Sequence, residues 1–350
     1  MEKILSIIIP TYNAEKFLDK GLTSYIMEDE DLMNKLEVIV VNDGTPDNSV
    51  AVAQKYVDMH PNVFSIINKE NGGHGSGINV GVEHVTGKYF KVIDADDWVL
   101  TDALERLIKY LEEIETVEAV VTSYYTYDIS KDFLELQDVQ VPDYDKVYNL
   151  EELMPYWGDI HLGFSFHGLV YNTAFYKKVG YKVVEKAFYE DQEYASIPLC
   201  WASQIRILRD PMYMYRIGDV GQSVATSSQL NRLPDFEKVL WKMMEFESEL
   251  DKLPPGGREH WARKVSKFIA SVYHICMIKN PDKKSKREYL EWFNSEIEKR
   301  SPYIYSCVIN KYKVFKLFNK LHMSEDFYAF VFGPALKFAK KYLGVGKLYV

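Results

Sequence analysis

Three carboxylates stand within four residues of the sequence, at Asp94, Asp96 and Asp97. Carboxylates this close repel one another unless a cation lies between them. Oxygen ligands suit a hard divalent cation such as Mg2+ or Mn2+, and such an ion can neutralise phosphate groups. The cluster therefore predicts a metal site made of Asp94, Asp96 and Asp97. An acidic loop leading into the helix start at residue 101 is the alternative interpretation.

A second polar segment consists of Pro10, Thr11, Tyr12 and Asn13. Thr11 and Asn13 offer hydrogen-bonding groups, and the ring of Tyr12 can pack beside a nucleobase. The segment therefore predicts a nucleoside contact. The alternative is a strand-to-helix turn in which Asn13 caps the helix, and the two interpretations are compatible.

Two more segments offer groups for a nucleotide. Asp43 lies in residues 42–45, and its carboxylate can accept hydrogen bonds from the imide of uracil or from a ribose hydroxyl. Residues 71–79 are rich in glycine, which permits close backbone approach to phosphate or ribose. They fit neither G-x-G-x-x-G nor the GxxxxGK[ST] phosphate loop. The further predicted nucleotide contacts are Asn71, Gly72, Asn79, Asp94 and Ala95. His74 and His167 stay open between a ligand contact and simple packing.

Each polar segment follows a short apolar run, at residues 5–9, 36–41, 63–67 and 89–93. Runs of this length suit strands that are buried on both faces of a mainly parallel sheet. Helices are predicted between them, one capped by Thr45 with Pro46 behind it and one capped by Thr101. Alternation of strands and helices predicts an α/β fold with its site at the carboxyl ends of the strands.

Beyond residue 228 the apolar residues recur at helical spacing, which predicts a helical C-terminal region. The expected division is a catalytic domain at residues 1–227 and a helical region at residues 228–350. Residues 311–350 hold eight lysines against Glu325 and Asp326. A packed helical cap with solvated lysines is the favoured interpretation of this basic tail. Contact with an anionic membrane surface and formation of a homodimer are the alternatives, and residues 228–350 are also expected to be able to contact the acceptor.

The composition narrows the class of protein. The chain has 350 residues, 27% of them charged, and a formal net charge of -9, which argues against general nucleic-acid binding. Its three cysteines form no C-x-x-C pair and are expected to be buried thiols in a reducing compartment. No signal peptide is recognisable at the start. We therefore expect a cytoplasmic protein, with the inner face of the membrane as a second location.

The order of residues 6–13, 41–49 and 94–97 resembles that of family 2 glycosyltransferases. These are inverting enzymes of the GT-A fold that use nucleotide-activated sugars. The family usually has Asp-Asp-Gly-Ser in its second motif. Here Asn42 replaces the first Asp, and Asp43 holds the place expected to contact uracil. The family's glycine-rich segment commonly ends in Ala-Arg-Asn, whereas residues 77–79 read Gly-Ile-Asn and lack the arginine.

The resemblance continues downstream. Residues 188–193 are similar to the family's Glu-Asp motif, whose Asp is the catalytic base; this implies Asp191 as the base, with Glu190 as its rival. Residues 213–216, followed by 221–223, resemble the end of the catalytic domain. The resemblance implies transfer of a hexosyl or N-acetylhexosaminyl group from a UDP-sugar to a hydroxyl group of a glycan or glycolipid. Mn2+ or Mg2+ is the implied cofactor, and bacterial surface polysaccharide or glycoconjugate synthesis is the implied setting.

Two other functions remain open at this point. An inactive protein that only binds a sugar nucleotide or acts as a scaffold is suggested by Asn42 and by the missing arginine. A nucleotidyltransferase has a related architecture, but that class resembles a glycine-rich loop with Arg and Lys after the first strand. Residues 10–13 do not have that composition.

Overall fold

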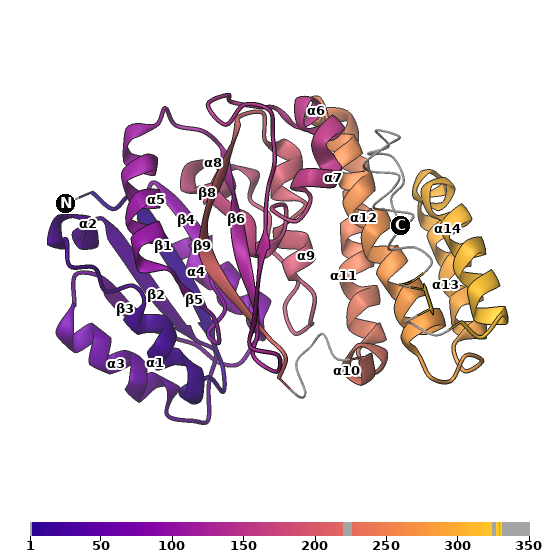
Figure 1. Cartoon of the computed structure of the whole chain (residues 1–350), viewed down its shortest axis with the longest axis horizontal. Coiled ribbons are helices and arrows are strands. Elements are labelled where there is room, and N and C mark those ends of the chain that lie inside the picture. Colours follow the sequence, from indigo (N-terminus) through magenta and orange to yellow (C-terminus); the bar gives the residue numbers. More distant parts are fainter. Residues whose placement is uncertain (1, 220–225, 324–326, 329, 331–350) are drawn as a thin grey trace.

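The computed structural model describes residues 2–219, 226–323, 327–328 and 330. Its strands are β1 (Leu5–Thr11), β2 (Leu36–Asn42), β3 (Phe64–Asn68), β4 (Tyr89–Val92), β5 (Trp98–Val99), β6 (Ala119–Asp128), β7 (Phe133–Gln137), β8 (Leu169–Asn172) and β9 (Ile205–Ile217). They form one sheet in the order β3-β2-β1-β4-β8-β6-β9-β5, with β7 paired to β6 (Figure 1).

Nine α-helices of the described chain come before the last strand, β9. They are α1 (Glu15–Thr23), α2 (Glu30–Asn34), α3 (Ser49–Met59), α4 (His74–His84), α5 (Thr101–Glu113), α6 (Leu150–Leu153), α7 (Trp157–Ile160), α8 (Thr173–Val179) and α9 (Asp191–Tyr194). After β9 come α10 (Thr226–Asn231), α11 (Leu233–Glu245), α12 (Gly257–His274), α13 (Arg287–Arg300) and α14 (Pro302–Lys320).

The direction of the strands changes across the sheet. β1 to β4 run parallel to one another, as the four apolar runs of the sequence predicted. β8 is antiparallel to β4, β6 is antiparallel to β8, and β9 is parallel to β6. The sheet is therefore mixed. Its parallel half comes from the part of the chain in which helices connect successive strands, because parallel neighbours need such crossovers.

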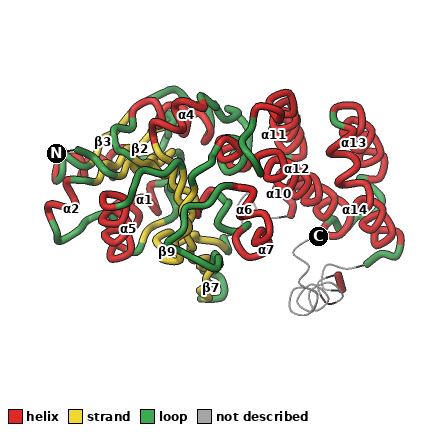
Figure 2. Tube along the Cα trace, turned by 90° about the horizontal axis from the view of Figure 1, so that it is seen from above, coloured by secondary structure: helices red, strands yellow, loops and turns green. Residues whose placement is uncertain are grey.

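The two faces of the sheet bury separate groups of apolar side chains. In β1, Leu5, Ile7 and Ile9 face one core, while Ile8 faces the other. The first core also receives α1, α3 and α5, and the second receives α4 and α8. Figure 2 shows α4 on one side of the strands and α1 with α5 on the other. This two-sided covering explains why β1 is apolar at successive positions instead of alternating.

The C-terminal helices gather at one end of the molecule, beside the sheet (Figure 1). Their core contains Trp261 and Phe293, and the indole of Trp261 donates a hydrogen bond to the backbone of Met243 (2.8 Å). Ile197 and Cys200, which precede β9, belong to the same core. The helical character of this region is confirmed, whereas the division at residues 227 and 228 stays a prediction. Residues 331–350 of the basic tail and residues 221–223 lie outside the described part.

Two helix starts differ from the expectation. Asn13 is not a cap: it has a φ of 52°, and Ala14 holds the N-cap position of α1. The helix expected from Thr45 begins only at Ser49. The hydroxyl of Thr45 donates to Asp47 (2.6 Å) and accepts from the backbone N–H of Asn13 (2.9 Å), so it ties two loops together instead of capping.

Smaller predictions were also tested by the structure. Thr101 is the first residue of α5, and its hydroxyl donates to the backbone oxygen of Ser24 (2.9 Å) instead of capping the helix. Cys200 and Cys276 are buried as expected, but Cys307 is exposed. None of the helices in the described ranges has the length and apolar character needed to cross a membrane.

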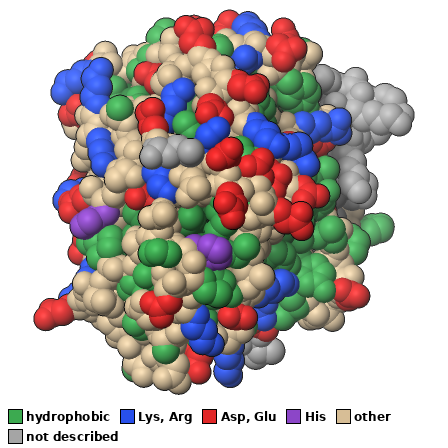
Figure 3. All heavy atoms as spheres, turned by 90° about the vertical axis from the view of Figure 1, so that its left-hand side faces the viewer, with side chains coloured by type: hydrophobic (Ala, Val, Ile, Leu, Met, Phe, Trp, Pro, Cys, Tyr) green, Lys and Arg blue, Asp and Glu red, His purple; other side chains and the backbone are tan. Residues whose placement is uncertain are grey.

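Figure 3 shows the end of the molecule opposite the C-terminal helices. On this face Lys and Arg side chains are interspersed with Asp and Glu side chains. Proteins that bind a nucleic-acid backbone usually do so with basic side chains clustered on one face. The face drawn in Figure 3 has a mixed charge instead.

Candidate active site

The acidic segment lies where the sequence placed it, directly after β4. Asp94 and Asp97 approach His167, which lies in the turn before β8. The candidate ligand atoms of these three side chains all lie within 4.8 Å of one another. β4 and β8 are hydrogen-bonded neighbours, so the sheet itself brings His167 to the acidic segment. The three side chains therefore form a candidate divalent-cation site.

Asp97 is the most enclosed carboxylate of the segment. It is buried, and it accepts hydrogen bonds from the hydroxyl of Tyr213 (2.5 Å) and from the backbone N–H of Arg216 (2.7 Å). Burial, followed by the negative charges of Asp94 and Asp96, raises the pKa of Asp97 well above its usual value. β9 thus fixes the Asp97 carboxylate, and a cation beside it would relieve the repulsion.

His167 suits a metal site in its charge state. Its ring stacks on Tyr215 with a centroid distance of 3.9 Å. Burial lowers the pKa of His167 to about 4, which keeps the imidazole neutral near pH 7. Its Nδ1 atom is buried and has no hydrogen-bond partner among the described residues. A neutral imidazole with an unused nitrogen is a common metal ligand. Together with two carboxylates it fits a cation such as Mn2+.

Asp96 is next to Asp97 in the sequence but is not one of the three converging side chains, which are Asp94, Asp97 and His167. Its Oδ2 atom is 4.0 Å from a guanidinium nitrogen of Arg216. Burial and the charge of Asp94 raise the pKa of Asp96 to about 6. The metal role expected for Asp96 therefore stays a prediction. His167, which the sequence left open, is the residue brought together with Asp94 and Asp97.

His74 joins two parts of the site. This first residue of α4 places Nε2 at 2.9 Å from Asp94 and Nδ1 at 2.6 Å from Glu190. Burial opposes protonation of the ring, but the hydrogen bonds and charges of Asp94 and Glu190 outweigh it and raise the pKa of His74 well above its usual value. The glycine-rich segment therefore connects the acidic segment to the Glu-Asp segment.

Asp191 lies at the start of α9, directly after the buried Glu190. The side-chain amide of Gln192 donates a hydrogen bond to Asp191 (2.7 Å). Burial, followed by the charge of Glu190, raises the pKa of Asp191 to about 6. A carboxylate with a pKa closer to neutrality is better matched to proton transfer near pH 7. These properties fit the role of base that the resemblance implied for Asp191.

Asp43 holds the glycine-rich segment in place. Its buried carboxylate accepts hydrogen bonds from the backbone N–H groups of Gly72 (2.8 Å) and Gly73 (2.7 Å) and from the ammonium of Lys69 (2.5 Å). The side chain of Asn71 donates to the backbone oxygen of Asp43 (3.0 Å). A contact of Asp43 with uracil stays a prediction. In such a contact the carboxylate would bind uracil in addition to Gly72, Gly73 and Lys69.

Asn79, an expected nucleotide contact, has its side chain tied to residues 183–185, and the nucleotide contact stays a prediction. Its amide nitrogen donates to the backbone of Val183 (3.0 Å) and to the carboxylate of Glu185 (3.1 Å). Its amide oxygen accepts from the backbone N–H of Val183 (3.0 Å). Because both amide hydrogens are committed, the side chain clamps α4 to residues 183–185.

The residues after β1 form the rim of the same edge of the sheet. Thr11 is buried, and its hydroxyl donates to the backbone of Ile9 (2.9 Å). Tyr12 is 49% exposed, so its ring is available for a ligand. Pro10 is buried and Ala95 partly buried. The nucleotide contacts expected from these residues stay predictions.

Gly75 allows α4 to pack closely on the Glu-Asp segment. A Cβ atom at this position would lie 2.2 Å from the backbone oxygen of Val184 and 2.9 Å from Glu190. Gly75→Ala adds about 1 kcal/mol of helix propensity, yet it must push that segment away. A shift of this kind can cost a factor of about 100 in rate.

We therefore expect Gly75→Ala to lower kcat of the reaction that the resemblance implies about a hundredfold. The control is Glu83→Ala on the same helix, which removes only an exposed ion pair with Lys182 and should leave kcat unchanged. Steady-state kinetics of the two variants provide the comparison. Full activity of Gly75→Ala would show that the close packing has no role in positioning the site.

The sequence matches the family described as Glycosyl transferase family 2 over residues 6–180. Glycosyltransferase GlyA of Streptococcus pneumoniae serotype 4 is 30% identical over 145 residues, which cover 41% of this chain and 20% of that protein. The minor teichoic acid biosynthesis protein GgaB of Bacillus subtilis is 32% identical over 108 residues, or 31% of this chain and 12% of that protein. The matched segments thus span a minor part of these two relatives.

A solved structure extends the likeness to nearly the whole chain. S. aureus TarS 1–349, in complex with UDP-GlcNAc, superposes with a TM-score of 0.62 at 17% sequence identity. The superposition covers 91% of this chain and 92% of that one. At this level of identity the likeness concerns the fold, which is therefore the GT-A fold with a helical C-terminal region.

Proposed function

The chain belongs to glycosyl transferase family 2, and we propose that it moves a sugar from a UDP-sugar to a hydroxyl acceptor with inversion at the anomeric carbon. One observation carries the proposal: His74 links Asp94 of the candidate cation site to Glu190, the neighbour of Asp191. This link supports a proposed site for the leaving diphosphate and a proposed base for the acceptor at one edge of the sheet.

Asp191 acts as the base in this proposal. The acceptor hydroxyl attacks the anomeric carbon while the bond from that carbon to the diphosphate breaks, and Asp191 takes the hydroxyl proton. Glu190 cannot easily take this role, because its carboxylate is buried and is held by His74 at 2.6 Å. Glu190 and His74 keep the base segment at a fixed position relative to Asp94.

Asp94, Asp97 and His167 would hold the divalent cation, with Asp96 as the further ligand expected from the sequence. A bound Mn2+ or Mg2+ supplies positive charge that stabilises the diphosphate as it leaves. The oxygen and imidazole donors, the repulsion among the carboxylates and the unused nitrogen of His167 support this assignment.

The identities of the donor and the acceptor are proposals that the comparisons support. The complex of TarS with UDP-GlcNAc supports a uridine nucleotide, whose nucleoside would contact residues 10–13 and Asp43. The likeness to GgaB, a minor teichoic acid biosynthesis protein, supports an acceptor in surface polysaccharide or glycoconjugate synthesis. The cytoplasmic location, contact with a membrane, a homodimer and acceptor contacts by residues 228–350 remain predictions.

A binding screen tests the proposed donor. The melting temperature is measured with UDP and a panel of UDP-sugars, each with Mn2+, with Mg2+ and with chelator. A ligand at one hundred times its Kd adds about 2.7 kcal/mol of stability. We expect stabilisation by UDP and by one UDP-sugar that disappears with chelator, and release of UDP when an acceptor is added.

The outcomes separate the rival functions. Stabilisation without any transfer to a range of acceptors would favour the inactive sugar-nucleotide-binding protein. Stabilisation by nucleoside triphosphates with release of pyrophosphate would favour a nucleotidyltransferase. No response to any nucleotide would overturn the proposal.

A further inference from the structure

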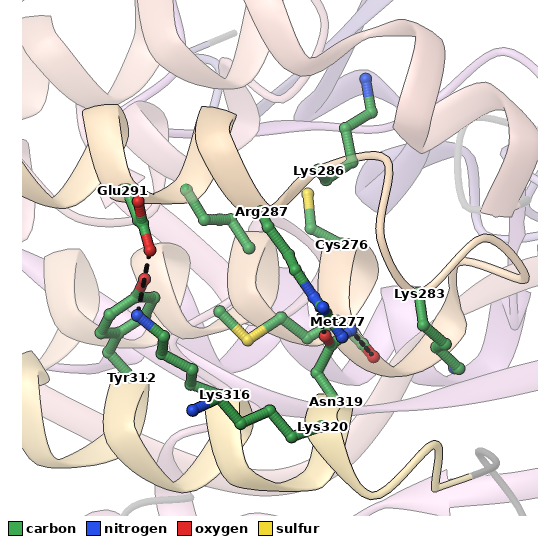
Figure 4. A pocket seen from close by; sticks show the side chains of 11 residues that line it. Cys276, Met277, Lys283, Lys286, Arg287, Glu291, Tyr312, Lys316, Asn319 and Lys320 are labelled. Atoms are coloured by element: carbon green, nitrogen blue, oxygen red, sulfur yellow. Dashed lines mark hydrogen bonds and ion pairs between the residues drawn. The ribbon is translucent and has the colours of Figure 1, made fainter.

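A second pocket lies in the C-terminal helical region (Figure 4), and Figure 1 shows α13 and α14 at the end of the molecule away from β1 to β4. It is formed by α13, α14 and the short helical segment Ile275–Lys279, and it has a volume of about 280 Å³. The residues that line it are Cys276, Met277, Lys283, Lys286, Arg287, Leu290, Glu291, Tyr312, Lys316, Asn319 and Lys320.

The lining carries an excess of positive charge. Four lysines and one arginine face a single carboxylate, that of Glu291. Glu291 pairs with Lys316 at 3.1 Å, and both side chains are substantially exposed. An exposed ion pair contributes little stability. Among the described residues Lys286, Arg287 and Lys320 form no ion pair with this carboxylate, and the ammonium of Lys320 makes no hydrogen bond or ion pair with the described part of the chain.

Arg287 is held in one orientation by a buried amide. Its Nε–H donates to the side-chain oxygen of Asn319 (2.9 Å), and the amide nitrogen of Asn319 donates to the backbone of Met277 (3.1 Å). Asn319 is only 3% exposed. Figure 4 shows the guanidinium lying over Asn319. The terminal nitrogens of Arg287 make no hydrogen bond to the described part of the chain, so they remain available as a fixed pair of donors.

The floor of the pocket is apolar. Met277, Leu290 and Cys276 are buried, and Tyr312 closes one side. A ligand that fits this pocket therefore combines an anionic group with a short carbon skeleton. A fixed guanidinium with neighbouring ammonium groups suits a phosphate, which offers several acceptor oxygens and at least one full negative charge.

We propose that this pocket binds the phosphate group of a phosphate ester, with Arg287 as the oriented donor and Lys320 and Lys316 as the surrounding cations. The apolar floor takes the carbon atoms of the ester. The site is built entirely from the C-terminal helical region, including the loop before α13, and is separate from the donor site proposed above. It gives the helical region a binding role of its own.

The test uses the full chain and two sources of the same chemistry. Isothermal titration measures binding of inorganic phosphate and glycerol 3-phosphate, and co-sedimentation measures binding to phosphatidylcholine vesicles with and without phosphatidylglycerol. The variant is the double substitution Arg287→Gln and Lys320→Gln. Lys284→Gln is the matched control, because Lys284 is exposed in the same loop and does not line the pocket.

We expect the double variant to lose at least about tenfold in affinity, since two charge-assisted contacts are removed, while Lys284→Gln binds like the native chain. Arg287→Lys should lie between them, because it keeps the charge and loses the fork. Saturable binding of the soluble ester would identify a soluble phosphate ester as the source. Binding only to vesicles with phosphatidylglycerol, lost in the double variant, would identify a lipid headgroup.

Equal binding by the native chain and the double variant, or no binding to any of the probes, would overturn the proposal. The response of each variant to UDP with Mn2+ shows whether it is folded and whether the donor site is intact. A failure of the pocket with an intact UDP response leaves the proposed transferase function untouched.

Discussion

Replacing Asp191 with Asn is expected to lower kcat for sugar transfer by about two to four orders of magnitude, the range typical of a lost general base. The amide has nearly the shape of the carboxylate and can keep the contact with Gln192, so the fold and UDP-sugar binding should persist. Stopped transfer assays with saturating donor measure the rate, and thermal shifts with UDP measure donor binding.

The dependence of kcat/KM on pH is a second test of Asp191 as the base. Because burial raises the pKa of Asp191 to about 6, the ionised base is lost as the pH falls through that value. We expect kcat/KM of the native enzyme to decline below about pH 6, and the residual activity of Asp191→Asn to lack this decline. Glu190→Gln should be slower than the native enzyme because it weakens the contact with His74, yet it should keep the pH dependence.

Asp31→Asn is the matched control for this pair, because Asp31 is an exposed carboxylate on α2. It should behave like the native chain in rate and pH profile. If Glu190→Gln abolished the decline and Asp191→Asn kept it, Glu190 would be the base and the assignment of Asp191 would be wrong.

Replacing Asp94 with Asn should remove most of the dependence of UDP binding and of sugar transfer on a divalent cation. Asp94 offers one of the three converging candidate ligands, with Asp97 and His167. A bound cation stabilises the charge of the transition state by several kcal/mol, and loss of a ligand weakens this stabilisation. The rate of transfer should therefore fall at least about a hundredfold. In thermal-shift titrations the stabilisation by UDP in Mn2+ should drop to the level seen with chelator.

His74→Gln separates the two tasks of Asp94, since Asp94 also accepts a hydrogen bond from His74. If Asp94 is a metal ligand, His74→Gln should keep the Mn2+-dependent stabilisation by UDP and lose rate only. If Asp94 serves only to orient His74, the two variants should share one phenotype with normal Mn2+ dependence. That second result would remove Asp94 from the cation site.

Several features could be predicted because their signals are local. β1 to β4 follow from short β-branched runs that end at polar residues, and α5 follows from the spacing of Leu104, Leu107, Ile108 and Leu111. The position of the acidic segment after β4 follows from the same pattern. The candidate base, Asp191, came from a short motif in the expected order along the chain, and its burial beside Glu190 fits that assignment.

Other features depend on contacts between distant parts of the chain. His74 and Glu190 are 116 positions apart, and only the packing of α4 against the segment before α9 brings them to hydrogen-bonding distance. His167 joins Asp94 because β8 inserts beside β4, reversing the direction of the sheet. No local pattern in the sequence distinguishes these two histidines from histidines that merely fill space.

The sequence by itself determined the types of element, the order of the motifs and the carboxylates that can do chemistry. The tertiary structure decided which side chains remain available for a ligand. Asp43 and Asn79 are held by the loops they support, whereas the Nδ1 atom of His167 and the outer nitrogens of Arg287 have no partner in the described part of the chain. The physical reason is that a buried polar group takes the nearest partner in space, and spatial neighbours are set by long-range packing.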